Sequence, residues 1–336
     1  MPRKKSKPST ETPEVSTERM AVSGSWSSVR RGVLDPRSTP FRMTGPGRTR
    51  TRTERELARA ARLVAGRVFA TPEEQGLFLA EHRETPAPPR TDLERAQELV
   101  YDAWEAPADQ RVELARQALD LCPSCADAWL LLAEAAAPGE ERLDLCRKAV
   151  KAGLEVLEEE PAEATEDQWN RLEARPYLRA RAGLARALWE TGEAREAINE
   201  YSVLMDLNPG DNLGLRYLVL PLLIEARRIP EALSLSRRWG GEPSGEWTYN
   251  LALLLFAREG AGVRAQEMLR RALQANALIP PYLLGLKPLP NQVPDTLSFG
   301  GEDEAVDYGH RAQAAWRSVA GALDWLGQAA LEPAAP

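Results

Sequence analysis

The chain has 336 residues, of which 43% are apolar and 28% are charged, and these proportions are those of a globular protein. Its longest mostly apolar stretches, residues 213–226 and 247–257, are interrupted by charged residues and proline or are too short to span a bilayer. We therefore expect no transmembrane segment. The few cysteines, and the polar residues that follow the first lysines, indicate neither a disulfide framework nor an export signal, so a cytoplasmic protein is predicted.

The formal net charge of −7 is distributed very unevenly along the chain. Residues 1–62 contain fifteen Lys and Arg against six Asp and Glu, a net charge of +9, which leaves −16 for residues 63–336. This distribution predicts a basic arm that is joined to an acidic body.

Residues 1–53 are rich in Ser, Thr, Pro, Gly and Arg and contain no regularly spaced apolar positions. Such a segment cannot bury enough surface to offset its chain entropy, so we expect a disordered basic arm. Three roles stay open for it. The first is a plain disordered tail. The second is a segment that binds nucleic acid or anionic lipid through its arginines, and the third is a segment that lies on the acidic body of the same chain.

Residues 54–90 are expected to form a short helical segment followed by a proline-rich linker. Apolar residues between 54 and 69 have helical spacing, and Thr71 followed by Pro72 is typical of a helix start. Prolines then gather at residues 86–89, where we expect the chain to break before the main body.

Residues 91–278 carry a recurring helix-pair pattern. Each second helix has a small residue where it packs beneath the first helix, and the last three, Ala197, Ala232 and Ala265, lie 35 and 33 residues apart. These steps bracket the tetratricopeptide period of about 34 residues. A single helix pair cannot cover its own apolar face, so successive pairs stack. The pattern therefore predicts about four tetratricopeptide-like repeats.

Several irregularities interrupt the array. Residues 155–167 form an acidic insertion, and residues 168–190 are predicted to form one long first helix. Pro221 falls inside a predicted helix, which it should kink. Residues 279–331 are predicted to form a strap too rich in proline for a helix, and then one helix over 302–328 that caps the array.

The third repeat resembles the tetratricopeptide superfamily most clearly. The residues that match it in order and spacing are Leu184, Ala185, Leu188, Gly192, Ala197, Tyr201 and Pro209. This resemblance implies an all-α, helical-repeat solenoid in which the first helices line a concave groove. It also implies that the protein binds partner segments in that groove.

A second resemblance covers residues 176–326, which are similar to the C-terminal region of the suppressor of tumorigenicity 7 family and its short bacterial relatives. The residues that carry it are Arg175–Ala180, the stretch 276–284 ending in Pro-Pro-Tyr-Leu-Leu, Asp303–Val306, Trp316 and Gly321–Leu323. Animal members of that family are helical-repeat proteins associated with membranes. The resemblance implies no catalytic activity and transfers no site residue.

Cys122 and Cys125 have CxxC spacing, which is typical of half a zinc site or of a redox pair. Pro123 between them stands where a repeat leaves its second helix, and no second ligand pair lies close in sequence, so a structural role is favoured. The acidic residues 158–167 lack the ligand order of a calcium loop, and the sequence contains no phosphate-binding glycine motif. We therefore expect no metal, no cofactor and no enzymatic activity.

The sharpest candidate for a binding site is on the long helix predicted after the acidic insertion. Arg175, Arg179 and Arg186 fall on one face of it, on the side that lines the groove in a tetratricopeptide frame. The next repeats bring Tyr217 and Asn250 to similar positions. Guanidinium groups bind carboxylates and phosphates in a two-pronged manner, so this set indicates an acidic or C-terminal partner peptide.

The alternative for these arginines is that they are solvated or paired with Glu173 or Glu190 at helical spacing. The leading hypothesis for function is a non-catalytic scaffold or adaptor that binds a protein or peptide partner in the groove. The second hypothesis is a nucleic-acid-associated protein that uses residues 1–53 for affinity.

Overall fold

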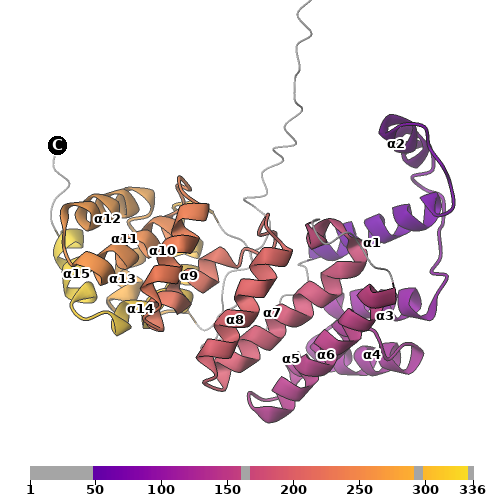
Figure 1. Ribbon diagram of the computed structural model, residues 1–336, viewed down its shortest axis with the longest axis horizontal. Coiled ribbons are helices and arrows are strands. Elements are labelled where there is room, and N and C mark those ends of the chain that lie inside the picture. Colours follow the sequence, from indigo (N-terminus) through magenta and orange to yellow (C-terminus); the bar gives the residue numbers. More distant parts are fainter. Residues whose placement is uncertain (1–47, 160–166, 291–297, 332–336) are drawn as a thin grey trace, which may run out of the picture.

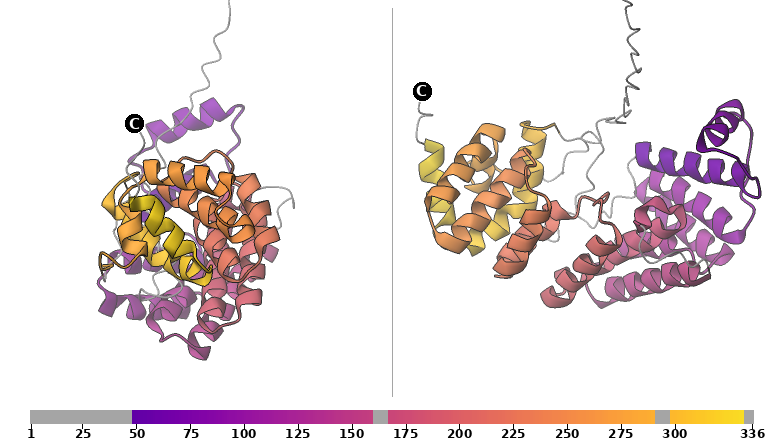
Figure 2. Two further views of the ribbon diagram at one scale, coloured as in Figure 1. Left: turned by 90° about the vertical axis from the view of Figure 1, so that its left-hand side faces the viewer. Right: turned by 45° about the horizontal axis from the view of Figure 1, so that its top comes forward.

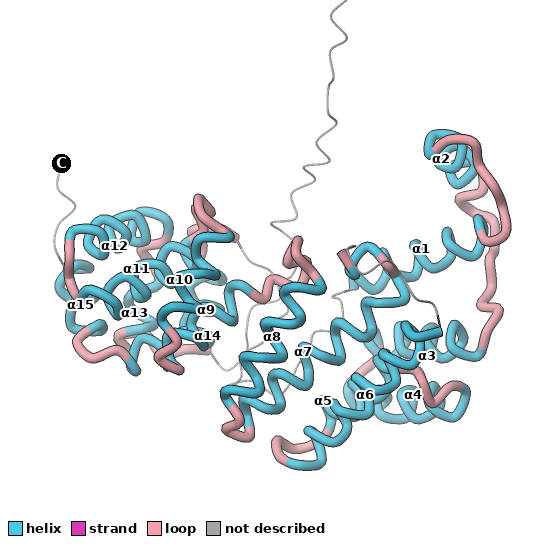
Figure 3. The backbone as a smooth tube through the Cα atoms, in the orientation of Figure 1, coloured by secondary structure: helices cyan, strands magenta, loops and turns pink. Residues whose placement is uncertain are grey.

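The computed structural model describes the backbone of residues 48–159, 167–290 and 298–331, and every regular element in these ranges is helical (Figure 1, Figure 3). The expectations for residues 1–47 and 160–166 lie outside the described residues. The repeats contain α3 (Asp92–Glu105), α4 (Ala108–Leu121), α5 (Ala126–Ala135), α6 (Glu140–Glu159), α7 (Arg175–Glu190), α8 (Ala194–Leu207), α9 (Arg216–Glu225), α10 (Ile229–Arg238), α11 (Gly245–Glu259) and α12 (Val263–Ala275). The other elements are α1 (Arg48–Val64), α2 (Pro72–Glu81), the short 3-10 helices η2 (Gln168–Asn170) and η3 (Leu172–Ala174), α13 (Ile279–Leu283), α14 (Glu302–Ser318) and α15 (Ala322–Leu331).

Successive helices pack as pairs: α3 with α4, α5 with α6, α7 with α8, α9 with α10, and α11 with α12. The first helices α3, α5 and α7 contact one another in turn, as do α9 and α11. Figure 1 shows the pairs side by side along the molecule. The all-α, tetratricopeptide-like fold is thereby confirmed, with five pairs in the described residues where the period indicated about four.

The small residues that define the repeat pattern lie in the second helices and are fully buried. They are Ala118, Ala149, Ala197, Ala232 and Ala265. Because protein interiors are close-packed, a small side chain lets two helix backbones approach each other. Gly153 of α6 has the same role, since a Cβ atom added there would lie 2.9 Å from the Cα of Tyr177 on α7.

Local capping residues start α2, as expected, and also α3. The Oγ1 atom of Thr71 accepts a hydrogen bond from the backbone N–H of Glu74 at 3.2 Å, and Pro72 stands in the first turn of α2. Thr91 and Glu94 form a capping box at the start of α3, in which each side chain accepts from the other's backbone N–H at 3.1 Å. A few neighbouring residues therefore fix where these two helices begin.

The long helix predicted over residues 168–190 is wrong for its first part. Residues 168–174 form η2 and η3, and α7 begins at Arg175. Pro176 explains the difference, because proline lacks an N–H and clashes with the carbonyl four residues earlier, so an α-helix tolerates it best in the first turn. Pro221, by contrast, lies inside α9, as predicted.

Two helices extend into segments for which no helix was predicted. α1 begins at Arg48, within the segment expected to be disordered as far as residue 53, and α6 reaches Glu159, within the acidic insertion. Every second residue of 48–53 is Arg, and Glu predominates in 155–159; both are good helix formers, so the helical periodicity of the neighbouring residues continues into these stretches.

The region after residue 278 differs from the prediction in two places. Residues 279–283 form α13, because Pro280 and Pro281 stand in its first turn, where proline is tolerated. The single C-terminal helix that was predicted is divided into α14 and α15 before Gly321, whose φ of 77° lies in the left-handed region that favours glycine.

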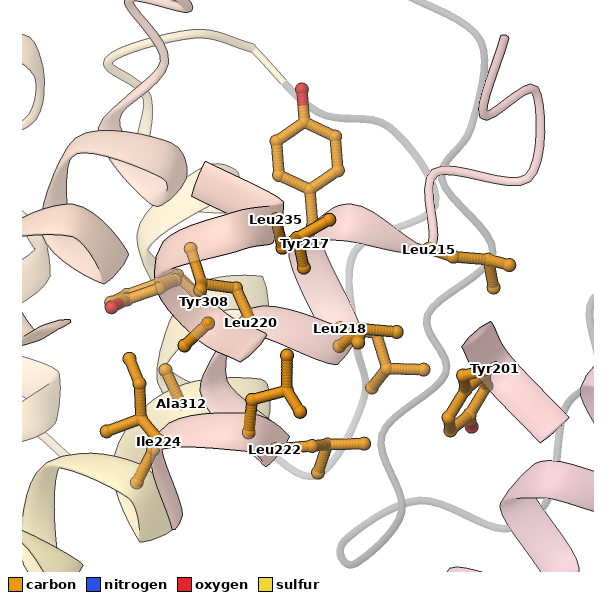
Figure 4. Close-up of a cluster of buried hydrophobic side chains, with 14 of the residues drawn as sticks. Tyr201, Leu215, Tyr217, Leu218, Leu220, Leu222, Ile224, Leu235, Tyr308 and Ala312 are labelled. Carbon is orange, nitrogen blue, oxygen red and sulfur yellow. The ribbon is translucent and has the colours of Figure 1, made fainter. Parts of the chain in front are cut away.

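Buried apolar side chains form two clusters in the described residues. The smaller cluster joins α3, α4 and α5, and the larger one extends from α5 to α15. Figure 4 shows part of the larger cluster, where Tyr308 and Ala312 of α14 lie beside Leu220 and Ile224 of α9. α14 therefore packs against α9 and α11 within the array, whereas α15 packs against α12 and α13 at its end.

α1 and α2 stand apart from both clusters. No described side chain of these two helices belongs to either cluster, and α2 contains no buried residue. α1 lies against α3 at one end of the molecule, and α2 projects beyond it in Figure 1 and in the right-hand view of Figure 2. In the part of the chain that the structure describes, no helix is both long enough and apolar enough to cross a membrane.

Candidate partner-binding face

The first helices of the repeats, α3, α5, α7, α9 and α11, present a surface that we name the first-helix face. A helix from outside the repeats packs against this face near each end. α1 contacts α3 and reaches α7 through Glu54, whereas α14 contacts α9 and α11. All five residues predicted to bind a partner belong to α7, α9 or α11.

Arg179 is the centre of a buried charge cluster between α1, α5 and α7. Its Nε and Nη2 atoms donate to Oδ1 and Oδ2 of Asp127 at 2.9 and 2.6 Å. Its Nη1 atom donates to Oε1 and Oε2 of Glu54 at 2.9 and 3.1 Å. Arg179 and Glu54 are each 4% exposed and Asp127 is fully buried. One guanidinium therefore binds carboxylates from two other helices, which is the chemistry that its planar fork favours.

α3 completes the surroundings of Arg179. The Nε2 atom of Gln97 donates to Oδ2 of Asp127 at 3.0 Å. The ring of Trp104 lies 5.1 Å from the guanidinium carbon of Arg179, within range of a cation–π interaction. The helices α3, α5 and α7 therefore all contribute side chains to one polar site.

Arg175 stands at the edge of the same cluster. Its Nη1 atom lies 3.8 Å from Oε1 of Glu54, and its Nε atom donates to the backbone carbonyl of Trp169 at 3.0 Å. Burial lowers the pKa of Arg175. Burial also acts to lower the pKa of Arg179, but the charges of Asp127 and Glu54 outweigh it and raise that pKa. Because an arginine in a protein stays protonated, the two guanidiniums form a permanent cationic site for a carboxylate.

A second set of charged groups attaches α1 to α3. The Nη2 atom of Arg62 lies 3.2 Å from Oε1 of Glu98, and its Nε atom donates to the backbone carbonyl of Ala87 at 2.7 Å. Arg55 forms ion pairs with Glu98 and Asp102. Arginines of α1 therefore meet an acidic row on α3, next to the site where Glu54 meets the arginines of α7.

The buried residues of α1 are charged. Between residues 52 and 64, the only buried side chains are Glu54 and Arg62, and apolar Leu57 is 42% exposed. Ion pairs and hydrogen bonds therefore provide the fully buried contacts of this helix on the first-helix face, whereas its apolar residues are at most half-buried.

Arg186 lies outside this cluster although it shares α7. It is fully buried, and its Nε atom donates to Oε1 of Glu190 at 2.8 Å. Arg142 of α6 donates from Nη1 to the other oxygen of Glu190 at 2.7 Å. The pairing of Arg186 with Glu190, which helical spacing suggested as an alternative, is therefore present, and it joins α6 to α7.

Tyr217 and Asn250 also bond within the fold. Tyr217 is 2% exposed, and its hydroxyl donates a hydrogen bond to Glu242. Asn250 is fully buried, and its Oδ1 atom accepts from the hydroxyl of Tyr308 on α14 at 3.0 Å. That hydroxyl accepts from Nε1 of Trp316 at 2.9 Å. The structure thus brings Arg175 and Arg179 together at Glu54 and places the other three predicted residues in separate contacts.

α14 is held differently from α1. It also carries a buried ion pair, in which Nη1 of Arg311 lies 2.6 Å from Oε1 of Glu246 on α11. However, it buries a set of apolar and aromatic side chains completely: Ala305, Tyr308, Ala312 and Trp316. α14 is therefore part of the hydrophobic core, whereas α1 is not.

Sequence reasoning missed the acidic residues of the site. Asp127 stands in a run of Ala, Trp and Leu on α5, and a lone charge in such a run is a signal of a buried pair. Glu54 carries no such signal. It lies 125 residues from Arg179 in sequence, so no local spacing connects the two residues.

Cys122 and Cys125 lie at the junction between α4 and α5. Cys122 is half-buried at the end of α4, and Cys125 is buried at the start of α5, with its Sγ atom 3.9 Å from Oε1 of Gln97. Burial raises the pKa of the Cys125 thiol. Among the described residues, no three His, Cys, Asp or Glu side chains are grouped so that they could hold a metal ion.

Known proteins resemble this chain over most of its length. Suppressor of tumorigenicity 7 protein-like of Homo sapiens is 28% identical over 270 residues, covering 70% of this chain and 45% of that protein. Suppressor of tumorigenicity 7 protein of Macaca fascicularis is 28% identical over 238 residues, covering 62% of this chain and 43% of that protein. A homologue of that protein in Caenorhabditis elegans is 26% identical over 297 residues, covering 76% and 53%.

These comparisons confirm the resemblance to the suppressor of tumorigenicity 7 proteins and extend it beyond residues 176–326. The chain spans about half the length of the curated relatives it matches. No protein-family model matches the chain. The crystal structure of YrrB, a tetratricopeptide protein with an unusual peptide-binding site, matches with a TM-score of 0.38 and 19% sequence identity, covering 59% of this chain and 90% of that one.

Proposed function

We propose that this protein is a non-catalytic interaction scaffold that binds a helical segment of a partner protein across α3, α5 and α7. Arg175 and Arg179 receive a carboxylate of that segment. The observation that carries the proposal is that α1 already lies in this position, with Glu54 bound between the two arginines. The first-helix face therefore accepts a helix that is not part of the repeat array.

The chemistry of the position supports a polar, specific contact. Guanidinium groups recognise carboxylates in a directional manner, and Trp104 adds an aromatic surface beside Arg179. Recognition of a helix lying in a groove is a common mode of peptide binding. A partner helix with an acidic side chain fits this combination.

The other predicted residues have a supporting part in the proposal. Arg186, Tyr217 and Asn250 are each at most 2% exposed. They join α6 to α7, α9 to the loop before α11, and α11 to α14, through Glu190, Glu242 and Tyr308. They therefore hold the repeats in place, and direct contact with the partner belongs to Arg175 and Arg179.

The test is capture of partners from native lysate by the full chain and by two charge-reversal variants. Arg175→Glu changes the carboxylate site, whereas Arg195→Glu changes an arginine of α8 whose side chain is 83% exposed. We expect mass spectrometry to find a set of proteins with the wild type and with Arg195→Glu that is lost with Arg175→Glu. Circular dichroism should show equal helicity for all three chains. An identical captured set for both variants would remove Arg175 from the binding site.

A further inference from the structure

We propose that α1 is a built-in competitor for this face, and that the partner segment is a helix with the charge pattern of α1: a carboxylate followed one and eight residues later by arginines. This inference rests on the proposed function and specifies its partner. α1 shows the pattern in Glu54, Arg55 and Arg62. The partner helix displaces α1 by making the same contacts.

The first step is the arrangement of charge on the face that α1 covers. At one side, Arg175 and Arg179 are balanced by Asp127 and Glu54. Without Glu54, two guanidiniums face a single carboxylate, and the site has an excess positive charge. One further carboxylate, from a helix that lies on α5 and α7, would balance this charge.

The second step is the acidic row on α3. Glu98 pairs with Arg55 at 3.4 Å and with Arg62 at 3.2 Å, and Asp102 also pairs with Arg55. Arg55 and Arg62 are seven residues apart, so they lie on the same side of the helix. An all-acidic segment would meet repulsion here. The face therefore requires both signs of charge at a fixed spacing.

The third step is that α1 can leave without opening the hydrophobic core. Neither α1 nor α2 contributes a described side chain to the two apolar clusters. The segment between α1 and α3 contains α2, which has no buried residue. This segment forms a tether that keeps α1 close when it is detached. α14, which buries Tyr308 and Trp316, is the opposite case.

The fourth step is competition. A tethered helix has an effective concentration near millimolar, so α1 opposes every ligand that uses the same contacts. Weakening α1 should therefore strengthen the binding of a free helix with the same charge pattern. Glu54 is the residue to change, because Arg179 keeps its two hydrogen bonds with Asp127 when Glu54 is neutralised.

The experiment titrates a fluorescent peptide of residues 48–64 into full-length chains and measures anisotropy. The chains are the wild type, Glu54→Gln, and Glu56→Gln as the matched control. Glu56 is exposed and pairs only locally, with Arg59 at 3.1 Å. We expect the peptide to bind Glu54→Gln at least about tenfold more tightly than the other two chains. A peptide with Gln in place of Glu54 should lose this binding.

Hydrogen exchange of the same chains provides a readout that is independent of the peptide. Amides of residues 48–64 should exchange faster in Glu54→Gln than in Glu56→Gln. Equal exchange of these amides in the two variants, or equal peptide affinity for all three chains, would overturn the proposal that α1 competes for the face. Equal binding of the peptide with Gln at position 54 would overturn the charge pattern.

Two outcomes separate this inference from the proposed function. If partner capture depends on Arg175 but Glu54→Gln does not increase peptide binding, the face binds partners and α1 is not their competitor. If the peptide behaves as expected but Arg175→Glu captures the same proteins as the wild type, the proposed function fails. If the wild type is a dimer and Glu54→Gln is a monomer, the face binds α1 of a second copy. That result would overturn the proposal that the occupant is a helix of a different protein.

Discussion

Arg179 of α7 and Asp127 of α5 form a two-pronged ion pair that is buried on both sides, with N–O distances of 2.9 and 2.6 Å. The pair joins the first helices of adjacent repeats. The same guanidinium binds Glu54, so the contact that connects two repeats also recognises α1. One side chain, Arg179, thus both connects two repeats and belongs to the candidate binding site.

Replacing Arg179 should destabilise the fold strongly. Arg179→Gln leaves Asp127 buried without its cation, and losing one partner of a buried pair costs about 3 to 5 kcal/mol in the free energy of unfolding. The control is Arg195→Gln, since an exposed pair contributes at most about 1 kcal/mol. Urea unfolding followed by circular dichroism measures both. Equal midpoints for the two variants would mean that the buried pair adds nothing to stability.

The close contact of α6 with α7 should make Gly153 intolerant of a side chain. In Gly153→Ala the new Cβ would lie 2.9 Å from the Cα and Cβ of Tyr177, and such overpacking costs about 1 to 3 kcal/mol. In Gly76→Ala, within α2, the Cβ would meet no atom within 4 Å. That variant should gain helix propensity instead, by up to about 1 kcal/mol. Thermal unfolding measures the loss of stability in Gly153→Ala, and a stabilised Gly153→Ala would contradict the packing account. Hydrogen exchange of α2 measures the gain of helix stability in Gly76→Ala.

The three thiols should differ in reactivity. Burial is the main cause that raises the pKa of Cys146 to about 12 and also raises the pKa of Cys125, so both are almost fully protonated at about pH 8. We expect maleimide to modify Cys122 first in the native protein. All three thiols should react in urea, as mass spectrometry would show. Rapid native labelling of Cys125 would contradict its burial and would reopen the redox role of the CxxC pair.

Salt should loosen α1 selectively. Raising the ionic strength from about 0.1 M to about 1 M shortens the Debye length from about 10 Å to about 3 Å. The side chains of Arg55 and Asp102 are 30% and 55% exposed, so their ion pair is open to screening. Hydrogen exchange should therefore accelerate in α1. α14, which is held by apolar burial, should change little, and equal responses of both helices would show that α1 is not held by charge.

The sequence predicted much of the architecture. The small residues of the second helices, the cap at Thr71, and Pro221 within a helix are where the pattern placed them. Two helices, α1 and α6, are longer than predicted, and the other errors are at proline and glycine. Pro176 delays the start of α7, and Gly321 divides the last predicted helix, because in each case a single residue overrides a longer apolar pattern.

The candidate site was predicted less completely. Helical spacing placed Arg175 and Arg179 on one face, and the structure brings them together at Glu54. Spacing could not show that Arg186 pairs with Glu190, because it also allowed a solvated arginine. It could not show that α14 reaches Asn250, because that contact joins two residues 58 positions apart.

By itself, the sequence determined that this protein is a stack of helix pairs, because the period of its small and apolar residues is local and each pair must bury its exposed face against the next. Only the tertiary structure decided what lies on that stack. Glu54 and Arg179 are joined across 125 residues by the position of α1, and an ion pair between distant segments leaves no periodic trace in the sequence. The tertiary structure also separated a helix held by charge from one held by apolar burial, since that difference depends on which side chains become buried.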